Sequence, residues 1–240
     1  MTSMPANSNL SPTITASSSL TAKLWDMFAY PGQVFDEVIA APPRVLNWLV
    51  PTLLVAIASL FLLRTGYDNA TDLPTPSQTV EAQSSVSDSA ALQAVPGSTD
   101  WRRLSAVGVC GGAFAGTFWS AFLLWFIGRT FLKARFSFLK AVEVVGLTGV
   151  IMALGAVVTA LLVSIFGNPA ARPALSLLAL SLPFDSHVRL FLDVVNFFHL
   201  WGISVLAIGL SRLSGVTFKE AAFWVFGYWI VVRLGLILLA

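Results

Sequence analysis

The residues best suited to chemistry lie within an apolar stretch near the end of the chain. Arg189, Asp193, Asn196 and His199 follow one another at spacings of four, three and three, which places them roughly along one face of a helix. Arg233 lies in the next apolar stretch. Ionisable groups inside a membrane are costly, so they face other helices and pair with polar partners. We interpret these five residues as an intramembrane polar cluster.

Three kinds of chemistry compete for this cluster. Counted from the outer membrane edge, Asp193 and Arg233 differ in depth by about 3 Å, which predicts a direct ion pair with Asn196 or His199 as hydrogen-bonding neighbours. A His–Asp pair near the midplane is also typical of a proton or solute path. A metal site has too few candidate ligands, and the sequence has no hydrolase triad, HExxH or Walker motif. We prefer the structural ion pair, and we expect no catalytic residue, cofactor or metal.

Composition indicates a membrane protein. Of the 240 residues, 56% are hydrophobic and only 11% are charged, whereas soluble domains carry about 25% charged residues. The formal net charge of +2 does not favour a nucleic-acid partner. The single cysteine, Cys110, cannot form an intrachain disulfide. We therefore expect an all-α bundle of membrane-spanning helices with the lipid bilayer around it.

The first part of the chain is expected to lie outside the membrane. Residues 1–20 are rich in Ser, Thr, Asn and Pro, which is typical of a disordered tail. Residues 21–47 contain two amphipathic pieces on either side of Pro31, and both are shorter than the roughly 20 residues that a span needs. These helices either lie on the membrane surface or pack on the ends of the spans.

Five spans are expected. Their approximate bounds are 46–65, 104–130, 142–166, 187–211 and 221–240. An acidic hydrophilic loop at 66–103 separates the first two, and a proline-rich connector at 167–185 precedes the fourth. The apolar piece of this connector, residues 174–182, is too short to span and lies at the interface or re-enters part way.

Glycines mark close helix packing. Gly108, Gly112 and Gly116 recur every four residues in the second span and therefore share one helix face, where a second backbone can approach closely. Packing within the chain and homodimerisation both explain this face. Gly146, Gly149 and Gly155 of the third span are further positions of close packing.

The placement of Lys and Arg predicts the topology. The short loop from Arg129 to Lys140 carries four basic residues and no acid, so it is expected in the cytoplasm. The N-terminus is then cytoplasmic, and the acidic loop and the C-terminus lie at the outer face. The basic residues of the cytoplasmic loops are Arg129, Lys133, Arg135, Lys140, Arg212 and Lys219.

Three stretches resemble the Yip family of Rab/Ypt-interacting membrane proteins in its bacterial form. They are PGQVFDEVI at 31–39 followed by Pro42, FLKAV at 138–142, and HLW at 199–201 followed by GLSRLSGVTFKEA at 209–221. The resemblance covers residues 25–240 apart from the acidic loop, so residues 21–240 would form one Yip-like domain. It implies five spans, a cytoplasmic N-terminus and no enzymatic activity.

Partner binding in this family is not expected to transfer in detail. Eukaryotic members bind prenylated Rab GTPases and shape membranes, but their Asp-Leu-Tyr-Gly-Pro motif is absent here and Gly227-Tyr228-Trp229 matches a second motif only in part. We expect a non-enzymatic scaffold in a bacterial inner membrane that binds a protein partner, or a second copy of itself, at its cytoplasmic face. The alternative is a small solute or proton transporter or channel that uses the polar face of the fourth span.

Overall fold

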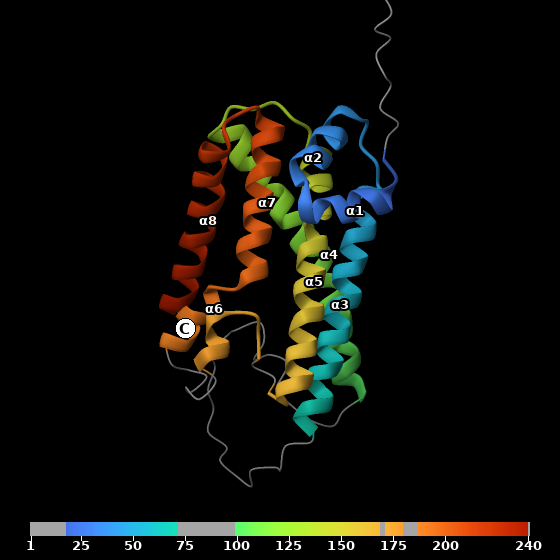
Figure 1. The fold of residues 1–240 in the computed structure, drawn as a ribbon, viewed down its shortest axis with the longest axis vertical. Coiled ribbons are helices and arrows are strands. Elements are labelled where there is room, and N and C mark those ends of the chain that lie inside the picture. Colours follow the sequence, from blue (N-terminus) through green and yellow to red (C-terminus); the bar gives the residue numbers. More distant parts are fainter. Residues whose placement is uncertain (1–17, 72–98, 169–170, 180–186, 240) are drawn as a thin grey trace, which may run out of the picture.

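The computed structural model describes residues 18–71, 99–168, 171–179 and 187–239. Within these ranges, long helices run side by side and two short helices lie across one end (Figure 1). The elements are α1 (Leu20–Ala29), α2 (Pro31–Ala40), α3 (Leu46–Thr71), α4 (Thr99–Thr130), α5 (Phe138–Phe166), the 3₁₀ helix η2 (Leu175–Ala179), α6 (His187–Val194), α7 (Phe197–Ser214) and α8 (Phe218–Leu239). The expected tail up to residue 17 and the centre of the acidic loop, 72–98, lie outside the described residues.

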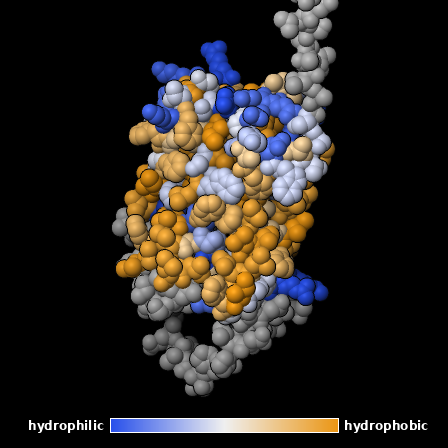
Figure 2. Space-filling model, in the orientation of Figure 1, coloured by the Kyte–Doolittle hydropathy of each residue, from blue (hydrophilic) through white to orange (hydrophobic). Residues whose placement is uncertain are grey.

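The predicted helical membrane bundle is confirmed. Four helices of the described chain are long and apolar enough to cross a membrane: Leu46–Tyr67, Arg103–Thr130, Phe138–Phe166 and Phe197–Ser214. On the face shown in Figure 2, apolar side chains cover most of the middle of the molecule, and most of the hydrophilic ones lie toward its two ends. Helix α8 occupies the position of the expected fifth span, and its crossing of the membrane stays a prediction.

Helix α5 is the centre of the bundle and packs against α3, α4 and α7. Ser137 accepts a hydrogen bond from the Lys140 backbone and caps the start of this helix. A Cβ added to Gly146 would lie 2.5 Å from the Trp48 Cα atom on α3. Only glycine allows this approach, so the predicted close packing at Gly146 is confirmed.

Helices α1 and α2 pack on the end of the bundle. Met27 on α1 and Phe35 on α2 are fully buried, and both belong to the same core cluster as α5 and α7. Trp25 points outward with 72% of its surface exposed. Of the two arrangements left open by the sequence, the structure has the one in which these helices pack on the ends of the spans. We call this end of the molecule the α1/α2 end.

The helix expected at 187–211 is broken. Helix α6 ends at Val194, and Asn196 has extended backbone and caps α7 by accepting hydrogen bonds from the Phe198 and His199 backbone. The preceding connector fills the break, since the Leu175 N–H donates to the Val195 carbonyl at 3.2 Å. The expectation of one continuous helix is therefore wrong, because an asparagine cap starts a new helix within the apolar stretch.

The limits of the hydrophilic loop also differ from the expectation. Helix α3 continues to Thr71 and α4 begins at Thr99, so both ends of the segment expected as a loop at 66–103 are helical. The 32 residues of α4 correspond to about 48 Å of helix, which exceeds the roughly 30 Å of a hydrocarbon core. Helix formation therefore continues into the polar sequence, past the point where hydropathy falls.

Candidate functional site

A buried polar network at the α1/α2 end joins three helices. Glu143 on α5 is 1% exposed. Its carboxylate accepts hydrogen bonds from the Lys140 ammonium, the Asn47 side-chain amide and the Arg44 backbone N–H, each at 2.7 Å. The Lys140 ammonium also donates to the Val38 carbonyl at the end of α2, at 2.6 Å. A single ion pair thus connects α5 to α2 and to the start of α3.

The network fixes position more than it adds stability. A buried ion pair is often no more stable than a well-packed apolar pair of equal volume, whereas removing one partner costs about 3–5 kcal/mol. Every polar group named in this network has a partner, which makes the arrangement specific. Helices α2 and α3 are therefore held in one register relative to α5.

A second link ties the start of α1 to α2. Glu37 accepts hydrogen bonds from the Ser18 backbone N–H and hydroxyl, both at 2.6 Å, and its carboxylate lies 3.5 Å from the Lys23 ammonium. Partial burial raises the pKa of Glu37, but the hydrogen bonds from Ser18 and the charge of Lys23 outweigh it, so the pKa of this carboxyl lies below its ordinary value of 4.5. The carboxylate form therefore holds the two helices together.

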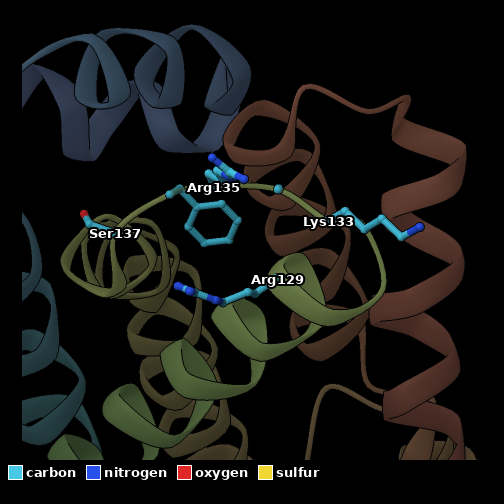
Figure 3. A pocket seen from close by; sticks show the side chains of 6 residues that line it. Arg129, Lys133, Arg135 and Ser137 are labelled. Carbon is cyan, nitrogen blue, oxygen red and sulfur yellow. The ribbon is translucent and has the colours of Figure 1, made fainter.

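The loop between α4 and α5 forms an open basic cavity of about 540 Å³. Arg129 at the end of α4 and Lys133 and Arg135 in the loop line it, together with Ala134, Phe136 and Ser137. Arg135 and Arg129 lie one above the other in the view of Figure 3, and the Lys133 side chain extends away from both. None of the described carboxylates lines the cavity, and three cationic side chains do, so its lining is positively charged.

The other predicted basic residues are placed differently. Lys140 is 8% exposed and belongs to the buried network, so the structure places it in the first turn of α5 and not in the basic loop. The Arg212 guanidinium lies 3.5 Å from the Asp36 carboxylate, and both side chains are about half exposed. Lys219 is exposed in the first turn of α8. Arg212 thus links α7 to α2 at the surface, and Lys219 adds charge beside it.

The intramembrane polar cluster is only partly assembled. Among the described residues, the ion pairs within 4.0 Å are Lys23–Glu37, Lys140–Glu143 and Arg212–Asp36, so the predicted direct Asp193–Arg233 ion pair is wrong. The break at Asn196 turns α6 away from α7, and Asp193 accepts a hydrogen bond from the Ser176 hydroxyl of η2 instead.

The remaining members of the cluster have separate surroundings. The side-chain oxygen of Asn196 caps α7. His199 lies one turn further along the same helix and is partly buried. Arg233 on α8 is also partly buried, and the Arg189 side chain lies outside the described part of the chain. Asp193 and Asn196 are thus bonded to Ser176 and to the α7 backbone, whereas the charge of Arg233 acts on His199.

The glycine face of α4 contacts no neighbouring helix among the described residues. A Cβ added at Gly108, Gly112 or Gly116 would meet no atom within 4 Å in the described structure. Packing of this face within one chain, which was one of the two sequence interpretations, receives no support from the described residues. Association with a second copy stays a prediction.

Glu143 was not among the predicted site residues, although its carboxylate accepts three hydrogen bonds at the centre of the buried network. Its signal was present, because a carboxylate three residues after Lys140 inside an apolar run must find partners. The signal for the helix break was Asn196 directly before an apolar run, which is the pattern of a helix start.

The comparisons with known proteins agree with this architecture. No curated protein and no solved structure matches the chain. The family model of the Yip1 domain matches residues 25–240, which include α2, the buried network, the basic loop and both helices of the final hairpin. The matched region covers most of the chain, from the middle of α1 onward, and this multipass integral membrane protein belongs to the Yip1 domain family.

Proposed function

We propose that the protein is a non-enzymatic scaffold that presents a rigid partner-binding face on the cytoplasmic side of a bacterial inner membrane. We define the α1/α2 face as the outer surfaces of α1 and α2, the α4–α5 loop and the turn from Arg212 to Lys219. In this proposal α8 is the fifth span, the N-terminus is cytoplasmic and the C-terminus is at the outer face. The partner is another protein or a second copy of this chain.

The observation that carries the proposal is the double anchoring of α1 and α2. Glu143 and Lys140 hold α2 and α3 to α5 from within, and Glu37 holds the start of α1 to α2. Surface helices without such contacts would move freely in the membrane interface. A buried network that fixes their position supports a surface whose shape matters, because a preorganised surface loses less entropy on binding.

The transport alternative has less support. It requires Asp193 and Asn196 to line a path, but Asp193 accepts from Ser176 and Asn196 caps α7. Both side chains are already hydrogen-bonded to protein groups. The cavity between η2 and α7 is lined by apolar residues such as Leu175, Val195 and Phe197, which offer no ligand to a solute ion.

Site-directed crosslinking in native membranes tests the proposal. A photoreactive residue replaces exposed Trp25 on α1 in one variant, and exposed Ile57 on the membrane-facing side of α3 in the control. We expect a discrete protein adduct from position 25, competed by excess wild-type protein or purified partner, and only lipid adducts from position 57. The proposal fails if position 25 gives no protein adduct and vesicles containing the protein show a solute or proton flux that His199→Ala abolishes.

A further inference from the structure

We propose that the cavity of the α4–α5 loop binds the phosphate group of an anionic phospholipid. Arg129 and Arg135 would hold the phosphate, and Lys133 would add positive charge at the rim. This inference goes beyond the partner-binding face, because it assigns a ligand to one of its loops. Only one part of the inference rests on the proposed function: the orientation of the protein decides from which leaflet the lipid comes.

The cations of the cavity have no ion-pair partner among the described residues, and the Arg129 guanidinium lies over the Trp125 ring, 5.4 Å from its centroid. Arg129, Lys133 and Arg135 form no ion pair within 4.0 Å in the described part of the chain, in contrast to Arg212, which pairs with Asp36. Two arginine forks with no carboxylate beside them match the bidentate geometry of a phosphate. The volume of about 540 Å³ lies within the range of small-molecule sites, about 300–1,000 Å³.

The local backbone builds the cavity. The Phe136 ring packs over Gly128, where an added Cβ would lie 2.5 Å from the ring. The Ala134 N–H donates to the Gly128 carbonyl at 2.9 Å, and Lys133 between them takes a left-handed conformation with φ 52°. The loop is therefore folded back on the end of α4, so that Arg135 and Arg129 line the same cavity.

The position of the cavity favours a lipid as the source of the phosphate. One membrane-crossing segment ends at Thr130 and the next begins at Phe138. The cavity lies between these two points, at the boundary between hydrocarbon and headgroups. Phe122, Phe126 and Arg129 follow one another at helical spacing on α4. Both phenylalanines are more than 40% exposed, and their rings stack on each other at 6.2 Å. This apolar strip leads away from the arginine into the membrane and provides a surface for an acyl chain.

Lipid retention by the purified full chain tests the inference. Native mass spectrometry compares adducts of phosphatidylglycerol and phosphatidylcholine on the wild type, on Arg129→Gln/Arg135→Gln and on the charge-matched control Arg44→Gln/Lys219→Gln, whose side chains are exposed outside the cavity. We expect the wild type to retain more phosphatidylglycerol than phosphatidylcholine. The cavity variant should lose about tenfold in phosphatidylglycerol affinity, and the control should lose little.

Three results would overturn the inference. Equal losses in both double variants would mean that general surface charge attracts the lipid. Complete displacement of the lipid by inorganic phosphate or glycerol phosphate at about 1 mM would identify a soluble phosphate compound as the ligand. A photoreactive residue at position 133 that reacts with a protein and not with lipid would assign the loop to the protein partner.

One further variant keeps the test independent of folding. Arg129→Lys/Arg135→Lys keeps both charges and loses the guanidinium forks, so we expect an intermediate loss of phosphatidylglycerol affinity with unchanged helicity. An affinity equal to that of the wild type would contradict the bidentate contacts. Lipid binding by purified protein does not depend on which side faces the cytoplasm. Failure of the proposed partner-binding face therefore leaves this measurement intact.

Discussion

Removal of the Glu143 carboxylate is the most informative perturbation of this structure. Glu143→Ala leaves the Lys140 ammonium without its counter-charge, and it leaves the Asn47 amide and the Arg44 N–H without an acceptor. Breaking a buried ion pair by removing one partner costs about 3–5 kcal/mol, and each buried donor left alone costs about 1–3 kcal/mol. Movement of the unpaired groups toward the nearby membrane surface offsets part of this energetic cost. We expect a loss of about 3–5 kcal/mol in the free energy of unfolding.

Reversible unfolding in mixed micelles of increasing SDS content measures this loss by circular dichroism. Glu220→Ala is the matched control, because Glu220 is an exposed acid at the same end of the bundle. Its interaction with the α8 helix dipole contributes about 0.3–1 kcal/mol to the free energy of unfolding. Equal destabilisation by the two variants would contradict the role given to the network.

A double variant separates the charge from the other hydrogen bonds. Lys140→Met removes the ammonium that Glu143→Leu leaves unpaired, so Lys140→Met/Glu143→Leu should be more stable than Glu143→Leu alone. If the losses of unfolding free energy caused by Lys140→Met and by Glu143→Leu simply add in the double variant, the two residues are not coupled. In that case the 2.7 Å contact between them would not act as an ion pair in the membrane.

Three further outcomes follow from other contacts. The pKa of Glu37 is lower in the folded protein than its usual 4.5, so its stabilisation of α1 is fully present above that value and is lost as the pH falls through the folded pKa. The protection factors of α1 against hydrogen exchange should fall over this acid range, and Glu37→Gln should abolish that pH dependence. Gly146→Ala should lower the free energy of unfolding by about 1–3 kcal/mol, because the added methyl group forces α5 away from Trp48. The methyl group of Gly112→Ala meets no described atom within 4 Å, so this variant should leave the unfolding free energy of the monomer unchanged or higher. Asn196→Ala should cost about 1–2 kcal/mol through loss of the α7 cap, visible in the same SDS titration.

Features that depend on hydropathy and local chemistry could be predicted from the sequence. Long apolar runs without charges identified the membrane helices because the bilayer sets their length. The close approach at Gly146 followed from the need for a small residue between packed helices. The basic loop from Arg129 to Arg135 was recognisable as a cluster of charge, but its folding over Gly128 into a cavity depends on Phe136, which the sequence does not distinguish from other aromatics.

Features that depend on which partner a polar residue chooses could not be predicted. Asp193 and Arg233 had matching depths along two ideal helices, but the break at Asn196 changed the direction of α6, and Ser176 became the partner of Asp193. Lys140 was grouped with the exposed cations because it ends the basic loop, whereas its ammonium reaches the Val38 carbonyl, 102 residues away in sequence. Contacts at such separations are set by packing, which one sequence does not reveal.

The sidedness of the α1/α2 face is the most direct test of the proposed function, because a cytoplasmic partner requires this face in the cytoplasm. In a Cys110→Ser background, which removes the only cysteine, single cysteines replace Trp25 or Lys219 at the α1/α2 end and Val188 on α6 at the other, all of them exposed. Intact cells are treated with a membrane-impermeant maleimide. We expect labelling at position 188 alone, with positions 25 and 219 reacting only after the membrane is opened. Labelling of positions 25 and 219 in intact cells would contradict the proposed function.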